Sequence, residues 1–522
     1  MRPSNNTQNH ARHNVGLIRT LVGLKNYHGM VCSFLTSREY QLRFGSVVTA
    51  AMPTALSNTR TVGKQSAERL IPLASTMADR SLQLSRHYLK GETNMLLEKK
   101  KTRWSFRPLL VLTLLTIVIV TPRTTRADVV TDWNQTALTS FNAANTRFVL
   151  QTRTLAMLHA AIFDAVNSVD HSYKPYAIDL QAPTGASPEA AAAAAAHRVL
   201  VTLIPTQLAN LNAAYVASLA AIPDGSSKTD GITVGETVAA GILALRSADG
   251  SSLNLPYTQP PAPGVWQPTP PGFLPAAAVA WGDVTPFTLR SGTQFLPEGP
   301  PGLTDEAYTA DFNEVKSLGA INSTTRTADQ TEAAQFWIEN SDFTWNLIAR
   351  LAADAKQNSL SQNARLFALL NLAGADAIIS GYKTKYIYNF WRPITAIRAA
   401  DTDGNDDTTA DPTWASLVVT PAHPDYISNH SAYSGAAANV LALVFADDTF
   451  DFNITTSTSP NGAIRSYHSF SQAADECGLA RIWVGFHFHT AVRHGLNQGK
   501  QIGRFAFEHY LKPVNGNGNT DD

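Results

Sequence analysis

The chain has 522 residues, of which 44% are hydrophobic and 16% are charged, a balance that argues against intrinsic disorder and against a surface that coats nucleic acid. This length exceeds what one core usually holds, and it predicts two globular units or one large helical body with a preceding segment. The formal net charge is zero, but residues 1–127 carry 19 Lys and Arg against 5 Asp and Glu, so the remaining chain is acidic.

Residues 95–127 have the pattern of a signal peptide. Lys99–Lys101 form part of a basic start, the apolar run 109–120 follows, and Ala127 precedes a potential cleavage point. Twelve apolar residues are too few to cross a bilayer core of about 30 Å, although an uncleaved signal that anchors the chain is an alternative. We therefore expect an exported protein, periplasmic or secreted, with no stable membrane span in the mature chain. Residues 1–94 are interpreted as a basic extension that is disordered or absent from the mature protein, and a transit peptide is a further interpretation of this leader.

Residues 128–255 predict a helical scaffold. Helical spacing of apolar residues is clear in 152–169 and again in 187–204. The second segment opens with Ser187 as an N-cap and Pro188 at the first helical position. Alternating strand patterns are scarce in the chain, so the predicted fold class is all-α.

Residues 256–302 divide the chain. The segment 256–301 holds 12 of the 28 prolines and cannot form a helix, while Trp266, Phe273 and Trp281 suggest a loop packed over the body. A second helical bundle is expected over 303–515. Its first helix is predicted at 303–319, and Thr327 begins a capping-box pattern ahead of the next.

Three clusters in this second bundle could carry chemistry. In the first, Lys385 and Arg392 are seven residues apart, a spacing that places both cations on one face of a continuous helix, and Pro393 tends to end that helix. Their aromatic neighbours favour partial burial, although two exposed surface cations are the ordinary alternative.

The second cluster is Ser428, Asn429 and His430, at the start of an apolar helical pattern, where unpaired backbone amides favour an anion. A capping histidine without a catalytic role is the alternative for His430. In the third cluster, Arg481 offers a planar donor fork and His487 follows after five intervening residues.

Taken in order, Lys-x6-Arg-Pro, Ser-x-His and Arg-x5-His resemble the superfamily of vanadium-dependent haloperoxidases and type 2 phosphatidic acid phosphatases. The stretches HAAIFDAVN, WQPTPP and FWRPITAIR are similar to its exported bacterial haloperoxidase-like branch. The resemblance implies a catalytic helical bundle of that type over 303–515, with an additional N-terminal helical part.

The resemblance also implies roles for individual residues. Lys385, Arg392 and Arg481 would bind the oxygens of vanadate or phosphate, and Ser428 and Asn429 would add hydrogen bonds. His430 would be the acid or base. His487 would bond to vanadium as the metal ligand, or would attack phosphorus to form a phosphohistidine.

The sequence departs from the family pattern at several positions. Ile427 and Asn429 replace the family's Pro and Gly, and Ala480 precedes the arginine where the family has Ser. Ala491 stands where a carboxylate often follows the second histidine by four positions; such a carboxylate would orient the imidazole. We consider Asp376, or Asp475 and Glu476, as carboxylates that instead pair with a site arginine.

The resulting hypothesis is a vanadate-dependent haloperoxidase-like enzyme that oxidises halide with hydrogen peroxide. The alternatives are an acid phosphatase that needs no cofactor and acts on phosphate esters, and a non-catalytic oxyanion-binding protein. A zinc or iron hydrolase is disfavoured, although five histidines could supply ligands, because no His-Glu-x-x-His stretch occurs and three cations would repel a divalent metal. Those histidines are His423, His430, His487, His489 and His494. The partners expected are small molecules, with no nucleic acid, and the sequence leaves the oligomeric state open.

Overall fold

Helices form nearly all the regular structure in the computed structural model, which describes residues 128–514. The predicted extension and signal peptide lie outside the described residues. The thirteen α-helices are α5 (Val129–Ala144), α6 (Phe148–Asp170), α7 (Pro188–Leu203), α8 (Leu208–Ala220), α9 (Ser226–Leu245), α10 (Glu306–Leu318), α11 (Ala328–Phe336), α12 (Ser341–Ala355), α13 (Leu360–Tyr388), α14 (Pro393–Arg398), α15 (Asn429–Phe445), α16 (Phe470–Trp483) and α17 (His489–His509).

A single hairpin supplies the strands of the described region. Strands β1 (Thr449–Ile454) and β2 (Arg465–Ser469) pair antiparallel with Phe452 opposite Tyr467. Short 3-10 turns occur at Pro205–Gln207, Trp281–Asp283, Ala400–Thr402 and Pro460–Gly462. The all-α prediction is confirmed.

The predicted helix starts follow the capping chemistry of the sequence. Ser187 accepts a hydrogen bond from the Ala190 amide at the start of α7, and Thr327 forms a complete capping box with Gln330 at the start of α11. The helix expected at 303–319 begins three residues later, at Glu306, and Gly319 is its C-cap. Local polar side chains therefore set these boundaries largely as expected.

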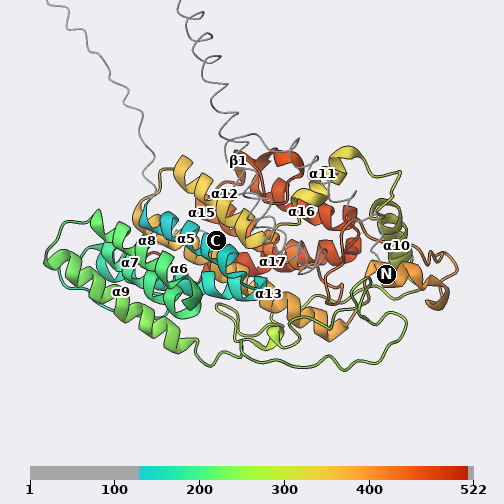
Figure 1. Ribbon diagram of the computed structural model, residues 1–522, viewed down its shortest axis with the longest axis horizontal. Coiled ribbons are helices and arrows are strands. Elements are labelled where there is room, and N and C mark those ends of the chain that lie inside the picture. The colour runs from blue at the N-terminus through green and yellow to red at the C-terminus, as the bar shows by residue number, and fades with distance from the viewer. Residues whose placement is uncertain (1–127, 515–522) are drawn as a thin grey trace, which may run out of the picture. The chain divides into compact units, whose positions relative to one another are not determined.

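Helix α13 is the central element of the described region. Figure 1 shows it between the scaffold helices α5–α9 and the C-terminal helices α15–α17, and it packs against α6, α15 and α17. It is long and apolar enough to cross a membrane, yet 94% of its most apolar window is buried inside the protein. Its burial on all sides identifies a core helix.

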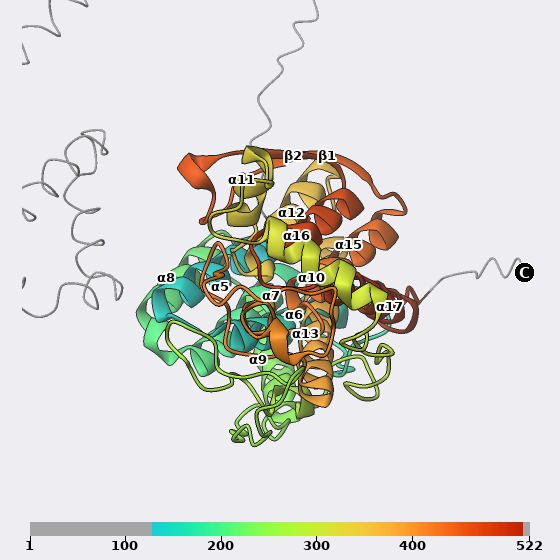
Figure 2. The same ribbon diagram turned by 90° about the vertical axis from the view of Figure 1, so that its right-hand side faces the viewer.

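The proline-rich segment packs against the bundle and reaches the turn after α13. It runs along one side of the bundle in both views (Figures 1 and 2). Trp266 and Trp281 are buried as predicted, but Phe273 is 63% exposed, so the expectation that it packs inward is wrong. The Trp266 amide donates to the Asn389 carbonyl at 2.7 Å, and the Trp391 amide donates to the Gly264 carbonyl at 2.9 Å. These bonds hold the chain that leads into Arg392.

Candidate active site

Lys385 lies in the last turn of α13 and is fully buried. Its Nζ donates to the carbonyls of Pro424, Asp425 and Ile427, at 2.8, 2.9 and 2.5 Å. An ammonium has three N–H donors, so these carbonyls take all of them. Burial, followed by the nearby Arg392, holds the pKa of Lys385 well below its usual value. The residue ties the 424–427 segment to α13.

Arg392 lies on a different helix from Lys385, which corrects the predicted shared face. Helix α13 ends at Tyr388 because Asn389 adopts the left-handed conformation, and Arg392 is the extended N-cap of α14. The rule that a residue before proline avoids the helical region accounts for the extended conformation of Arg392, whereas α13 already ends at Tyr388. The two cations are therefore brought together by the turn and by tertiary packing.

The guanidinium of Arg392 is buried among acceptors from two later segments. Its Nε donates to the His423 carbonyl at 2.7 Å, and its Nη1 donates to the Phe486 carbonyl at 2.8 Å and lies 3.1 Å from His487 Nε2. Arg392 thus contacts the segment before α15 and the segment before α17 at once.

The Ser428 cluster begins α15, as the sequence predicted. Ser428 is the N-cap, and its Oγ accepts hydrogen bonds from the Ser431 amide at 3.2 Å and from the Ser431 hydroxyl at 2.9 Å. Asn429 is the first helical residue and does not adopt the left-handed conformation. Its side chain fits beside α13 because residue 381 is glycine: a Cβ there would lie 2.3 Å from Asn429 Oδ1.

His430 is partly buried one position further along α15. Its Nε2 lies 3.2 Å from the Glu339 carbonyl, which can only accept, so Nε2 carries the proton. Burial, followed by the charge of Arg481, lowers the pKa of His430 to about 3. The ring is therefore neutral near pH 7, with the lone pair on Nδ1.

Arg481 is a buried cation that forms no hydrogen bond with a side chain or carbonyl of the described residues. It lies near the end of α16, is fully buried, and none of its three nitrogens has a hydrogen-bond partner among residues 128–514. Burying an unpaired guanidinium costs free energy of folding, on the order of several kcal/mol. Its charge lowers the pKa values of His430 and His487, which places it in the same cluster.

His487 lies in the bend between α16 and α17 and is almost fully buried. Burial, then Arg392 and Lys385, hold its pKa well below the usual value, so the ring is neutral. Its Nδ1 lies 2.9 Å from Asp425 Oδ1, within ion-pair distance, but the angles do not meet hydrogen-bond geometry. Burial raises the pKa of Asp425 to about 7, opposed by Arg392 and Lys385.

Contacts and charges link the sequence-predicted residues: Arg392 reaches His487, Arg481 lowers the pKa values of His430 and His487, and Asp425 lies beside His487 as an addition. Sequence reasoning missed this carboxylate because it looked after His487 and around Arg481, whereas Asp425 precedes Ser428 by three residues. The signal available was Asp425 itself, a carboxylate three residues before the predicted helix start at Ser428.

The carboxylates proposed from sequence to pair with a site arginine do not do so. Asp376 accepts hydrogen bonds from the amides of Phe287, Thr288 and Leu289, and so anchors the proline-rich segment to α13. Glu476 pairs with Arg465 on β2, and Asp475 is exposed. These interactions are structural and lie outside the cation cluster.

The histidines do not form a metal-binding group in the described part of the chain. No set of three or more His, Cys, Asp or Glu residues within 128–514 is arranged to hold a metal ion. His489 pairs with Glu314 at 2.9 Å, and His494 Nδ1 lies 2.5 Å from the Tyr426 hydroxyl. His423 contacts Arg392, with Nδ1 2.9 Å from Nη2.

Comparisons with known proteins give matches to vanadium haloperoxidases. Residues 365–516 match the family model described as the VCPO second helical-bundle domain. The chain is 26% identical over 436 residues to the vanadium chloroperoxidase of Curvularia inaequalis, covering 66% of this chain and 71% of that protein.

Solved structures extend the similarity. The crystal structure of a bacterial vanadium-dependent iodoperoxidase matches with a TM-score of 0.65 and 25% identity, over 74% of this chain and 97% of that one. A holo-type bacterial vanadium-dependent chloroperoxidase matches with a TM-score of 0.56 and 18% identity, over 69% and 91% of the two chains, and supports the fold alone. With the helical fold and the clustered Lys, Arg and His residues, these matches support a haloperoxidase-like function. They also support the superfamily of vanadium haloperoxidases and type 2 phosphatidic acid phosphatases as the family of this chain.

Proposed function

We propose that this protein is a vanadate-dependent haloperoxidase, which oxidises a halide with hydrogen peroxide. The observation that carries the proposal is the buried guanidinium of Arg481, whose three nitrogens lack hydrogen-bond partners in the region 128–514. A tetrahedral oxyanion would supply both the charge and the acceptors that this group lacks. Its neighbours, two further buried cations and a neutral imidazole, fit the same guest.

The residues that would hold vanadate follow from the donor set. Arg481 and Arg392 would bind its oxygens, Lys385 would add positive charge behind the 424–427 segment, and Ser428 and Asn429 would border the anion at the start of α15. His487 would bind vanadium through Nε2, whose single lone pair faces the donor-only Arg392; Arg392 would give up this contact and donate to a vanadate oxygen instead. Bound vanadate would supply the electrophilic centre at which hydrogen peroxide becomes reactive toward halide.

The protein's own contribution is to place charge and protons. The cations would stabilise negative charge that develops on the oxygens, in a site from which water is largely excluded. His430 would be the acid or base at Nδ1, since its other nitrogen donates to Glu339, and a bound anion would offset the charge of Arg481 that helps to lower its pKa.

A second candidate function is phosphatase activity through a phosphohistidine. The observation in its favour is the proximity of Asp425 to His487, because a carboxylate beside the imidazole is the arrangement that activates histidine as a nucleophile. Phosphate shares the charge and shape of vanadate, so one pocket suits both reactions.

Two assays on the full chain separate these functions. The first measures oxidation of iodide, bromide and chloride by hydrogen peroxide, with and without added orthovanadate; we expect turnover that requires vanadate. The second measures hydrolysis of p-nitrophenyl phosphate without vanadate, and turnover there alone would favour the phosphatase.

Arg504 on α17 is exposed and provides a matched control, because R504M removes an arginine outside the cluster. Its activity should equal that of the wild type. Inactivity in both assays, combined with phosphate binding measured by calorimetry, would contradict both enzymes and leave an oxyanion-binding protein.

A further inference from the structure

Asp425 is held by its backbone, and its carboxylate is buried without a hydrogen bond to a described residue. The residue is fully buried, its amide donates to the Phe390 carbonyl at 2.9 Å, and its own carbonyl accepts from Lys385. Neither carboxylate oxygen meets hydrogen-bond geometry with a partner in the described residues, and the nearest ring nitrogen is His487 Nδ1 at 2.9 Å. A buried carboxylate in this position requires an explanation.

The proton on His487 can be placed from its two neighbours. Arg392 is only a donor, so His487 Nε2, 3.1 Å from its Nη1, must be the acceptor. In a neutral imidazole the other nitrogen then carries the hydrogen. The Nδ1–H of His487 therefore lies on the side of the ring that faces Asp425, and a small rotation would complete the hydrogen bond.

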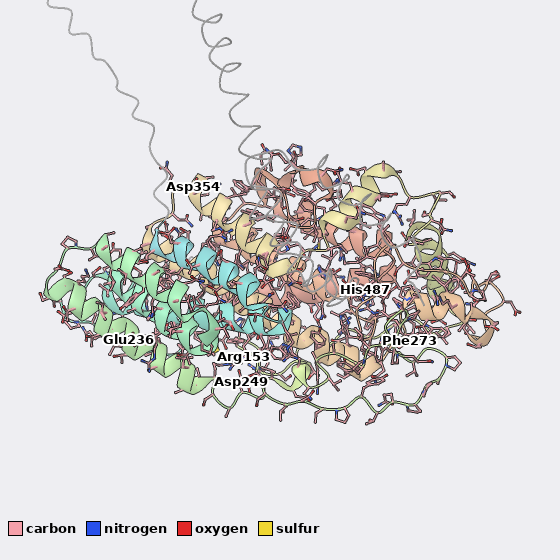
Figure 3. The ribbon with its side chains drawn as sticks, viewed as in Figure 1. Arg153, Glu236, Asp249, Phe273, Asp354 and His487 are labelled. Carbon is pink, nitrogen blue, oxygen red and sulfur yellow. The ribbon has the colours of Figure 1, made fainter. Side chains whose placement is uncertain are left out.

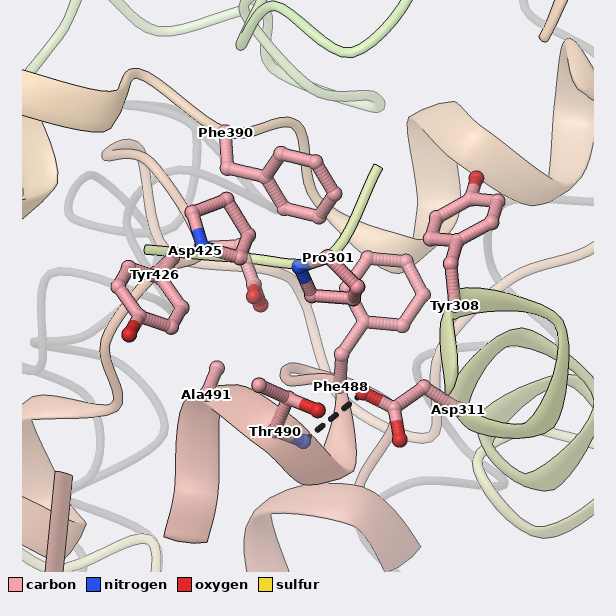
Figure 4. A pocket seen from close by; sticks show the side chains of 10 residues that line it. Pro301, Tyr308, Asp311, Phe390, Asp425, Tyr426, Phe488, Thr490 and Ala491 are labelled. Atoms are coloured by element: carbon pink, nitrogen blue, oxygen red, sulfur yellow. Dashed lines mark hydrogen bonds between the residues drawn. The ribbon is translucent and has the colours of Figure 1, made fainter. Parts of the chain in front are cut away.

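Ala491 lines the same pocket as Asp425. Figure 4 shows both side chains there, together with Asp311, Phe488 and Tyr308. Ala491 also fixes the neighbouring segment, because its carbonyl accepts from the Ser428 amide at 3.0 Å. The position four residues after His487 and the position of Asp425 thus line one pocket, and the carboxylate of Asp425 is the one that lies beside the imidazole.

We propose that Asp425 is the positioning residue of His487, supplying from the segment before α15 the carboxylate that position 491 lacks. This proposal rests on the proposed function. By holding the Nδ1–H, Asp425 keeps Nε2 aimed at the anion and raises its basicity, as outer carboxylates do for metal-bound histidines. The consequence is selectivity for an oxyanion whose central atom accepts a nitrogen ligand, such as vanadate, over phosphate held only by its oxygens.

A purely electrostatic role makes a different prediction. If Asp425 only balances the charges of Lys385 and Arg392, any neutral replacement would remove the same negative charge beside the anion. Affinities for vanadate and phosphate would then rise together, and their ratio would stay constant.

The test compares the affinities of the full-length protein for orthovanadate and inorganic phosphate by calorimetry. Asp425→Leu fills the space without an acceptor, and we expect the vanadate-to-phosphate affinity ratio to fall about tenfold or more. Asp425→Asn loses the charge but keeps an acceptor oxygen, and its ratio should stay much closer to that of the wild type. In the double variant D425A/A491D, a carboxylate reaches the pocket from α17 and should restore most of the ratio.

Each outcome decides the proposal. An unchanged ratio in D425L, or equal changes in D425L and D425N, would overturn it; if D425L does not fold, D425A is measured against D425A/A491D, and equal ratios would overturn it. A wild type that binds neither anion would instead contradict the proposed function, so the two failures are distinguishable.

Discussion

The buried arginines of the scaffold differ from Arg481 of the site in their hydrogen-bond partners. In the scaffold, Arg153 of α6 and Arg246 after α9 share the carboxylate of Asp249, at 2.8 and 3.0 Å. Arg246 also donates to the carbonyls of Thr285 and Pro286. Figure 3 shows Arg153 and Asp249 close together, well away from His487. The scaffold arginines are therefore paired and hydrogen-bonded within the folded chain.

Arg481 has neither a carboxylate nor a hydrogen-bonded carbonyl in the described region, although it is just as deeply buried. A buried charge without a partner lowers the stability of the folded state, whereas a buried ion pair can leave the free energy of folding unchanged. The scaffold arginines thus join segments of the folded chain, whereas Arg481 lacks, among the described residues, the partners that the proposed anion would supply. The following predictions test this contrast.

The largest effect is expected from H487A. Removing the imidazole takes away the proposed vanadium ligand and also the proposed phosphate-attacking nitrogen, so either activity should fall at least about a hundredfold. The measurement is turnover in both assays, with R504M as the control. Full turnover in H487A would remove this histidine from the mechanism.

Substituting the two kinds of arginine should move stability in opposite directions. R481M removes an unpaired buried charge and should raise the free energy of unfolding of the anion-free protein by about 1–3 kcal/mol while abolishing phosphate binding. R153M leaves Asp249 with one arginine and should lower the free energy of unfolding by about 3 kcal/mol without changing phosphate affinity. Denaturant unfolding and calorimetry measure these changes, and a loss of stability in R481M would refute the contrast.

Asp342 tests whether unpaired burial is enough to indicate function. It is fully buried in α12, no salt bridge reaches it within 128–514, and burial raises its pKa to about 8. Because the folded state holds this proton more tightly than the unfolded state, wild-type stability should fall between about pH 4 and pH 8 and then level off.

The variant D342N lacks this titration. Relative to wild type, it should gain on the order of a few kcal/mol by pH 8, measured by denaturant unfolding across this pH range. Phosphate affinity should not change, because Asp342 lies outside the cation cluster. A pH-independent difference between the two proteins would contradict the assignment.

The smallest effects are expected at close helix–helix contacts, of which the scaffold and the site region each have one. A Cβ at Gly499 of α17 would lie 2.0 Å from the Ala432 carbonyl of α15, and a Cβ at Gly235 of α9 would lie 2.2 Å from the Ala191 carbonyl of α7. Both G499A and G235A should lower the free energy of unfolding by about 1–3 kcal/mol.

Only G499A should also weaken phosphate binding, because it displaces α15, whose first turn carries His430 and whose N-cap is Ser428. Thermal unfolding and phosphate titration of the two variants make the comparison. Equal phosphate affinities in G499A and G235A would show that the α15–α17 contact does not position the site.

The sequence by itself determined the helical class, several helix starts and the identities of the clustered residues. Capping at Ser187 and Thr327 depends on side chains within three residues of the helix start, so it can be predicted locally. The buried helix after Ser428 was likewise evident from its run of small and apolar residues.

Only the tertiary structure decided which partners the buried charged side chains have. The turn at Asn389 separates Lys385 from Arg392, and the approach of Asp425 to His487 joins segments 62 residues apart in the numbering of the chain. Spacing along a sequence fixes which side chains share a helix face, but long-range packing fixes which buried donor meets which acceptor. For that reason the carboxylate beside His487, and the missing partner of Arg481, became visible only in the folded chain.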